Sequence, residues 1–461
     1  MKLHHPLEPC AVSRLPASPP RLILLLFLGP ILAGLAQEPA LVIEPELVVS
    51  NTLAYSRQIK TADLDIQAAE ARQKQAQAQA LPKLSADSKA SWYTGLKDSS
   101  FGPAFTIPAI EDRYGAGVSI NQPAYTGGRI TSQKQGATFQ KQAALSNRDA
   151  TEADLRYRAL SAYWSWSKAY YGVETLQASV QRTEALSKET RDRLGAGMAT
   201  ENDALSTEVL LDQTRLQLAA ARRGVQLALS TLTFLTGRDF PSNSLPRQAA
   251  VVPEPVLAAE PALIAGALKN RPELEASRLD AKAAETAVKT ARSEYYPQLG
   301  LTARYEEARP NQMIIPPQDQ WDGDGFAGIT LNWSLFDWGL TRAKVKEAST
   351  RTAQAQLRRD QWQDQIIWET RQARINLVDA QERVVVANRA EASARKNLES
   401  ATALFKNGLL RYSEMLDANA KLTVAQNEAI ATRADAILAR AALEHAIGNL
   451  KSAVKARGQN P

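Results

Sequence analysis

The sequence predicts a mostly helical protein, built as two copies of one unit, in which each copy also adds two strands to a transmembrane β-barrel. Three observations lead to this fold class. Glycine turns at Gly197 and Gly408 interrupt long Ala-rich helical patterns. Landmark residues recur at a fixed spacing along the 461 residues. Four runs of about 9–11 residues alternate between apolar and polar side chains, and a tilted strand that crosses a bilayer has this length.

The spacing of the landmarks supports two copies. Gly197 and Gly408 are 211 residues apart, whereas Pro82 and Pro297 are 215 residues apart. The change of four residues falls between the paired strands, where a loop can absorb an insertion. Solenoid repeats are much shorter, at about 20–50 residues. The chain is therefore interpreted as an internally duplicated molecule.

Composition excludes several classes of function. Aromatic residues make up only 6% of the chain, which suits closely packed Ala-rich helices better than a large globular core. The single cysteine, Cys10, lies in the predicted leader, so no disulfide, thiolate metal site or cysteine nucleophile is expected. The net charge of +6 is spread out and suggests no nucleic-acid partner. No nucleophile motif, metal-ligand cluster or nucleotide loop is present, so we predict no enzyme, no metal and no cofactor.

The predicted domain organisation starts with a signal peptide at residues 1–36. Arg14 and Arg21 precede an apolar run that ends in small residues, as in a secretory signal. An uncleaved anchor helix is the alternative. The segments that follow are a first repeat (37–240), a Pro-rich linker (241–260), a second repeat (261–456) and a C-terminal tail (457–461).

Both copies are expected to follow the same order of elements. In the first copy these are an extended segment (37–50), a helix (53–80), two strands (84–93 and 114–122), a long helix (129–194) and a helix that ends at Gly237. In the second copy they are a helix (261–295), a strand (299–306), a loop (307–325), a strand (329–336), a long helix (340–406) and a helix (413–454). In each copy the two shorter helices together nearly equal the long one. We therefore expect them to stack end to end beside it.

The four strands are expected to lie in a membrane. Four strands cannot close a barrel, for which about eight is the minimum. An open edge in lipid would leave backbone groups unsatisfied. Three chains would supply twelve strands around a lumen, and the helices would continue the tube. The polar strand residues expected to line the lumen are Asp87, Lys89, Thr302, Arg304 and Asn332. The alternative is a soluble α+β protein with long coiled coils and two ordinary hairpins.

The turns between the helices have recognisable chemistry. Gly195 and Gly197 can end the first long helix in a left-handed conformation, and Gly408 can do the same in the second copy. Thr200 can cap the next helix, with Asp203 three residues on as its capping-box partner. Each turn is thus predicted to be the tip of a helical hairpin.

With these residues identified, the chain resembles the outer-membrane efflux proteins, the TolC-like exit ducts. The resemblance covers nearly all of the mature chain. It is carried by the duplication, the helix-proline-strand junctions at Pro82 and Pro297, the strand-to-helix signature at 335–339 and the glycine turns. It implies a homotrimeric 12-stranded barrel in outer-membrane lipid, continued by a long periplasmic α-helical barrel.

The resemblance also implies a function and partners. The chain would be the passive exit duct of a tripartite efflux pump or a type I secretion system, docked through its helix tips (Gly195, Gly197 and Gly408) to a periplasmic adaptor and an inner-membrane transporter. The predicted mature chain has only three methionines, so we favour small molecules over metal ions as cargo. The alternative from another class is a non-conducting, envelope-spanning coiled-coil protein, which would show no channel conductance.

The same resemblance points to a gate at the helix tips. Glu414 and Asp417 match acidic positions that line the family's periplasmic constriction, and Asp203 matches a gate-contact position. In a trimer Glu414 and Asp417 would each occur three times and form a constriction that attracts cations. The alternative is that acids in a first helical turn only cap the helix and complement its dipole.

At two positions this chain differs from the residues that form gate contacts in the family. Phe405 and Leu410 occupy positions where the best-known members have a tyrosine and a basic residue that form gate bonds. We hypothesise that Arg411 or Tyr412 substitutes for them.

Overall fold

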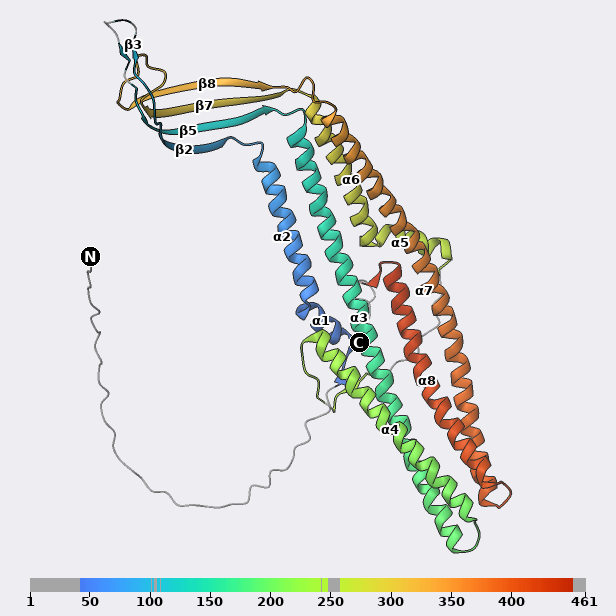
Figure 1. Ribbon diagram of the computed structural model, residues 1–461. Coiled ribbons are helices and arrows are strands. Elements are labelled where there is room, and N and C mark those ends of the chain that lie inside the picture. The colour runs from blue at the N-terminus through green and yellow to red at the C-terminus, as the bar shows by residue number, and fades with distance from the viewer. Residues whose placement is uncertain are drawn as a thin grey trace, which may run out of the picture. The chain divides into compact units, whose positions relative to one another are not determined.

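The computed structural model describes residues 42–100, 102, 106–107, 109–241, 243–247 and 258–450, all within one compact unit, Leu41–Pro461 (Figure 1). The predicted signal peptide, the C-terminal tail and much of the Pro-rich linker lie outside the described residues. Among the described helices, none is both long enough and apolar enough to cross a membrane.

The two halves of the chain contain the same main elements in the same order. The first half holds β1 (Val42–Ile43), α1 (Pro45–Tyr55), α2 (Arg57–Ala78), β2 (Lys83–Trp92), β3 (Ser99–Ser100), β4 (Thr106–Ile107), β5 (Asp112–Tyr125), α3 (Arg129–Gly195) and α4 (Glu201–Thr236). The second holds β6 (Leu245–Pro246), α5 (Glu260–Asn270), α6 (Pro272–Arg292), the short 3-10 helix η1 (Ser293–Tyr295), β7 (Gln298–Arg309), β8 (Asp322–Asn332), α7 (Leu340–Lys406) and α8 (Tyr412–Ala446).

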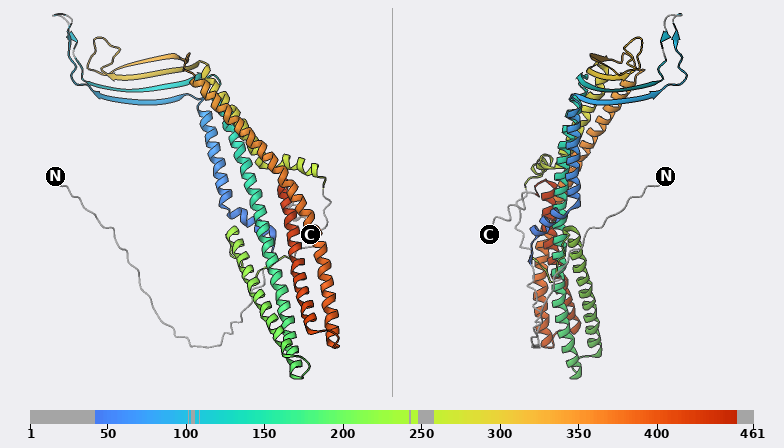
Figure 2. Two further views of the ribbon diagram at one scale, coloured as in Figure 1. Left: turned by 45° about the vertical axis from the view of Figure 1, so that its right-hand side comes forward. Right: turned by 90° about the vertical axis from the view of Figure 1, so that its left-hand side faces the viewer.

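The helices stack as the sequence predicts. α2 and α4 lie one after the other along α3, and α6 and α8 lie in the same way along α7 (Figures 1 and 2). Each long helix has 67 residues. α3 also contacts α6 and α8, so this helix joins the two halves. α2 and α4 therefore form one flank of the chain, and α7 forms the opposite flank.

An aromatic cluster on α3 packs the middle of the bundle. Tyr163 and Trp166 are fully buried, beside Val48 and Val49 of α1. The Tyr163 hydroxyl donates a hydrogen bond to the carbonyl oxygen of Ile43 at 2.9 Å. These aromatics therefore pack α3 against α1.

The first short helix of each half differs from the prediction. Residues 45–50 were expected to be extended but belong to α1, which starts with Pro45 at its first turn and buries two valines. The expected helices 53–80 and 261–295 are each broken once, at Ser56 and at Arg271. Ser56 caps α2 by accepting hydrogen bonds from the backbone N–H groups of Gln58 and Ile59. The two breaks are 215 residues apart, which is the spacing found in the upstream part of the repeat.

A buried arginine holds the second break together. The Arg271 side chain is only 4% exposed and donates to Glu273 at 3.0 Å and to Glu369 of α7 at 2.9 Å. It also donates to the carbonyl oxygen of Ala446 at the end of α8, at 3.3 Å. Burial lowers the pKa of Arg271, but its bonds to the two carboxylates outweigh this effect, and the pKa is raised. One guanidinium thus ties together α6, α7 and α8.

Replacing this arginine with alanine is expected to destabilise the bundle. Arg271→Ala leaves two partly buried carboxylates without their partner, which costs about 3–5 kcal/mol. The matched control is Arg371→Ala, because Arg371 is 57% exposed and binds Glu260 at 2.9 Å. An exposed pair of this kind contributes about 0–1 kcal/mol. Thermal unfolding of the two variants is monitored by circular dichroism. Equal unfolding midpoints would contradict a stabilising role of Arg271.

The four long strands form one antiparallel sheet in the order β2-β5-β7-β8. The register places Leu84, Ile120, Ala303 and Ala327 in one row across all four strands. Because neighbouring side chains alternate between faces, the predicted apolar and polar faces are confirmed. The pairing of β5 with β7 joins the two halves, and β2 and β8 are the two edges.

The bounds of the strands differ from the prediction: β7 ends later, and β8 both starts and ends earlier. The expected loop 307–325 contains the end of β7 and the start of β8, and residues 333–336 lie beyond β8. At the start of β8, Gly323 and Gly325 make room for the ring of Tyr305, since a Cβ at Gly323 would lie 2.4 Å from the Tyr305 hydroxyl. β5 likewise continues through Pro123, where the register with β7 shifts.

Candidate functional site

The sheet presents an uncovered apolar face. Ile329 is 75% exposed and Leu84 is 68% exposed, although both are large aliphatic residues on strands. Other apolar residues that are exposed on this face are Val118, Ile120, Leu301, Tyr305 and Leu331. A continuous apolar surface of this kind requires a partner or a lipid environment.

The opposite face of the sheet carries an ion-pair network. Arg304 on β7 donates to both carboxylate oxygens of Asp87 on β2, at 2.9 and 3.2 Å, and to Glu306 at 3.0 Å. To reach Asp87, Arg304 crosses the intervening strand β5 at Gly117. A Cβ at Gly117 would lie 3.1 Å from Nη2 of Arg304, so glycine gives the guanidinium its path.

The other three residues predicted for the lumen lie on the same polar face but outside this network. The Thr302 hydroxyl donates to the side-chain oxygen of Asn121 at 2.9 Å. Lys89 is opposite Gly115, toward the strand ends that are far from the helices. Asn332 is opposite Gln298, at the helical end of the sheet. The structure thus brings together two of the five residues, Asp87 and Arg304.

The helix tips are hairpin turns, as predicted. Gly197 has φ +74° and Gly408 has φ +72°, the left-handed region that favours glycine. At each tip a backbone N–H reaches back over the turn, from Met198 to Arg193 at 2.8 Å and from Leu409 to Leu404 at 2.9 Å. Gly195 is different, because it is the last residue of α3 and its φ is not in the left-handed region.

Asp203 forms the predicted capping box. Its carboxylate accepts hydrogen bonds from the backbone N–H of Thr200 at 3.0 Å and from the Thr200 hydroxyl at 2.7 Å. The Asp203 N–H donates to the Thr200 hydroxyl at 3.2 Å. Within one chain, therefore, this carboxylate is engaged in capping α4.

The acidic residues of the second tip are exposed at the start of α8. Asp417 forms an ion pair with Lys421 at 2.7 Å, one turn further along the helix. Arg411 is the N-cap residue of α8, and Glu414 lies in its first turn. The side chains of Arg411 and Glu414 make no hydrogen bond or ion pair with the part of the chain that the structure describes. Glu414 is thus available to line an opening, whereas Asp417 is partly neutralised.

Tyr412 connects the two hairpins. Its buried hydroxyl lies 2.6 Å from Oγ1 of Thr190 on α3 and 2.7 Å from Oγ1 of Thr207 on α4. Its ring packs against Phe405, with the centroids 5.4 Å apart, and the Arg193 guanidinium lies over the Phe405 ring at 4.4 Å. Burial raises the pKa of Tyr412, so the phenol keeps its proton at neutral pH. Of the two hypothesised substitutes for the family's gate bonds, Tyr412 makes contacts between hairpins and Arg411 does not.

Polar side chains also fill the seam between α3 and α8 above this tyrosine. Ser179 and Thr423 share a hydrogen bond at 2.9 Å, and the amide of Asn419 donates to Thr183 at 3.2 Å. Arg182 donates to the oxygen of Asn419 at 3.1 Å. The contact between α3 and α4 has an apolar core instead, and its buried residues are Leu176, Val180, Leu211 and Leu218. Two exposed ion pairs, Arg191–Glu208 at 3.1 Å and Arg215–Glu184 at 2.7 Å, flank this core. The α3–α4 pair is thus held largely by apolar packing, while the seam to α8 is rich in hydrogen bonds.

A sheet with one uncovered apolar face and one charged face, joined to long helical hairpins, is typical of a protein whose strands lie in a membrane. Sequence comparison gives the particular family. The outer membrane efflux protein family matches residues 48–238 and 263–449, once in each half. The chain belongs to this family.

Similarity to individual proteins supports this family assignment. The outer membrane efflux protein BepC of Brucella suis is 25% identical over 340 residues, covering 72% of each chain. TolC of Vibrio cholerae is 22% identical over 344 residues, covering 74% of this chain and 78% of the relative. The crystal structure of VceC from Vibrio cholerae matches with a TM-score of 0.72 at 19% identity, covering 88% of this chain and 96% of that one. The protein is therefore an efflux channel of the outer membrane, a member of a family of transport proteins.

Proposed function

We propose that three copies of the chain form one channel, with a closed 12-stranded barrel in the outer membrane and a helical barrel in the periplasm. The open four-stranded sheet carries this proposal. Within the described residues β2 and β8 each have a strand neighbour on one side only, and an unpaired edge in lipid is costly. Pairing β8 of one chain with β2 of the next closes the ring.

The helical flanks support the same assembly. Exposed apolar side chains occur on α4 at one flank and on α7 at the other. They are Leu216, Leu227 and Phe234 on α4, and Leu357, Trp368, Ile375 and Val386 on α7. Packing one flank against the other in the ring would cover these residues at each of its three junctions.

Within this assembly the channel would be a passive exit duct for small molecules. The energy would come from an inner-membrane transporter, joined through a periplasmic adaptor that docks near the tips at Gly197 and Gly408. Either a tripartite efflux pump or a type I secretion system fits this arrangement. The matching order of elements in 37–240 and 261–456, on either side of the linker 241–260, supports an origin by duplication of one half.

The tips would form the gate. The hydroxyl of Tyr412 and the polar seam between α3 and α8 would hold the α7–α8 hairpin against the α3–α4 hairpin in the closed state. Hydrogen bonds in such a seam can be exchanged for bonds to water at a small net cost. Separating α3 from α4 would instead expose the apolar core between them to water, which costs more. The hairpins would therefore move as units.

The acidic tip residues would make the closed gate selective for cations. Three copies of Glu414 around one opening would attract cations, and Glu414→Gln is expected to lower the ratio of K⁺ to Cl⁻ permeability. Asp417→Asn should have a smaller effect because Lys421 already pairs with this carboxylate. The control is Asp203→Asn, because the Asp203 carboxylate is engaged in the capping box of α4. Reversal potentials in a KCl gradient measure all three, and an unchanged ratio in Glu414→Gln would contradict an acidic constriction.

The assembly itself is tested by measuring the mass and the single-channel conductance of one detergent-purified sample. We expect a trimer with small, mostly closed, cation-selective conductance. A monomer, or a trimer that never conducts, would overturn the channel and favour the non-conducting coiled-coil protein.

A further inference from the structure

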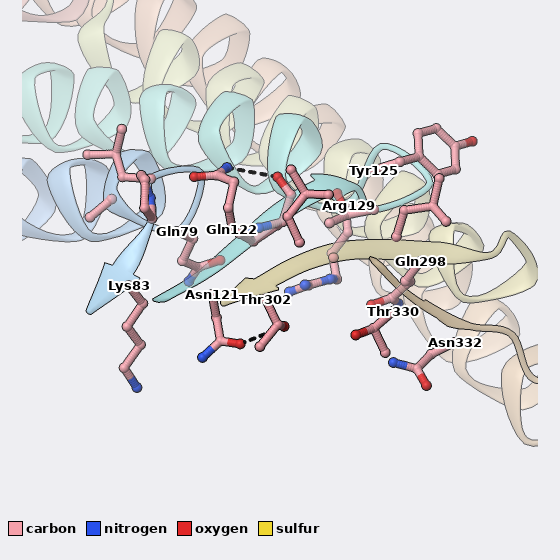
Figure 3. Close-up of a pocket in the computed structure, with 18 of the residues that line it drawn as sticks. Gln79, Lys83, Asn121, Gln122, Tyr125, Arg129, Gln298, Thr302, Thr330 and Asn332 are labelled. Carbon is pink, nitrogen blue, oxygen red and sulfur yellow. Dashed lines mark hydrogen bonds between the residues drawn. The ribbon is translucent and has the colours of Figure 1, made fainter. Parts of the chain in front are cut away.

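A large cavity lies where the sheet meets the helices. Its volume is about 1080 Å³, and its walls come from the end of α2, the start of α3 and the adjoining ends of β2, β5, β7 and β8. Figure 3 shows Lys83, Asn121, Thr302, Thr330 and Asn332 projecting from one side of the strands. This side is the polar face of the sheet. The cavity thus opens on the surface that would line the channel.

The lining of the cavity combines apolar surface with many amide and hydroxyl groups. The residues that carry these polar groups include Gln79, Asn121, Gln122, Gln298, Thr302 and Asn332. Some of them hold one another in place, as where the Thr302 hydroxyl donates to the Asn121 oxygen at 2.9 Å. The charged residues among the lining are Lys83 and Arg129, and no carboxylate lines the cavity.

These two cations lack the partners that other basic residues near the junction have. Lys141 of α3 binds Glu70 at 3.0 Å, and Lys344 of α7 binds Glu294 at 2.7 Å. Lys83 and Arg129 form no ion pair with any described residue. Two unneutralised positive charges beside a wall of hydrogen-bonding groups attract an anion and can orient its other polar groups.

We propose that this cavity is a binding site for organic anions, meaning carboxylates or sulfonates that also carry hydroxyl or amide groups. The positive charges of Lys83 and Arg129 would attract the anion, and the amides and hydroxyls would bind its polar groups. A transient binding site for exported molecules rests on the proposed function. The cavity itself does not need the trimer, because all of its walls belong to one chain. Binding must be weak, because a channel site has to release its ligand.

Carboxyfluorescein is a suitable probe because it is an organic anion with hydroxyl groups and is small enough for the cavity. Its fluorescence anisotropy is measured against detergent-purified full-length protein. We expect saturable binding that the double variant Lys83→Gln/Arg129→Gln weakens at least tenfold. Lys89→Gln, at the other end of the same polar face, is expected to bind like the unaltered protein. The cationic dye rhodamine 6G should not compete.

Two results would overturn the site. One is undiminished binding by the double variant, and the other is equal weakening by Lys89→Gln, which would indicate only the general charge of the sheet face. Circular dichroism and mass measurements check that each variant is folded and assembled. A positive charge at position 129 should be enough for binding, so Arg129→Lys is expected to bind the dye more tightly than Arg129→Gln. Conductance of the same samples is recorded separately. If the unaltered protein conducts but does not bind the dye, the site alone is overturned. If it binds the dye but does not conduct, the duct alone is overturned.

Discussion

A Tyr412→Phe variant is expected to leak. The substitution keeps the ring that packs on Phe405 but removes the hydroxyl that lies within 2.7 Å of both Thr190 and Thr207. Each lost hydrogen bond is worth about 0.5–1.5 kcal/mol. Six bonds in a ring of three chains add to about 3 kcal/mol at the low end, which is roughly a hundredfold in the ratio of closed to open channels.

Single-channel recording measures this leak as a rise in open probability. The matched control is Tyr171→Phe, which removes a hydroxyl that donates to the carbonyl oxygen of Pro246 at 3.1 Å, away from the tips. Open probability that rises equally in both variants, or in neither, would show that Tyr412 does not hold the gate.

The contribution of Tyr412 should not depend on pH in the physiological range. Burial raises the pKa of its phenol above the ordinary value of about 10. A raised pKa means that the bonded, neutral form is fully present below the ordinary value and is lost only as the pH rises through the raised one. The difference in open probability between Tyr412→Phe and the unaltered protein should therefore be constant from about pH 6 to pH 9.

An arginine on the apolar face of the sheet is expected to prevent assembly. Ile329 lies on β8 with its side chain uncovered, and an arginine facing lipid near the bilayer midplane costs about 2–4 kcal/mol in each chain. The neighbouring residue Thr330 points to the polar face, so Thr330→Arg adds the same charge to the aqueous side. The fraction of cross-linked trimer in outer-membrane preparations should fall strongly for Ile329→Arg only. Equal assembly of the two variants would contradict a lipid-facing sheet.

The long elements could be predicted from the sequence almost to the residue. α3 starts at Arg129 and α7 at Leu340, as predicted, because Gly128 and Gly339 precede them with left-handed backbone angles. Strand alternation also predicted both faces of the sheet. These features depend on local chemistry that recurs in both halves.

The features that could not be predicted depend on contacts between distant residues. Helix α1 exists because Val48 and Val49 meet the aromatic cluster of α3, which a short local pattern does not reveal. The start of β8 was assigned to a loop, because nothing in the sequence shows that the ring of Tyr305 lies over Gly323 and Gly325. Pro272 at the start of α6 was an available signal for the break at Arg271.

The contacts of the candidate site residues also differ in this way: local contacts could be predicted, and contacts between distant residues could not. The capping box of Asp203 could be predicted because all of its bonds are local. The contacts of Tyr412 could not, because Thr190 and Thr207 lie 222 and 205 residues away in the chain. The path of Arg304 over Gly117 was also hidden, since it needs the pairing of strands from different halves.

The two edges of the sheet, β2 and β8, have a genetic consequence. Because the edges differ, chains in the proposed ring join head to tail, and each chain uses both edges once. A chain with one damaged edge still joins a neighbour through its sound edge and leaves that ring open. In a cell that makes equal amounts of normal and damaged chains, roughly one ring in eight would contain only normal chains if three chains assemble at random. Edge mutations should therefore be dominant, whereas mutations that prevent a chain from folding should be recessive.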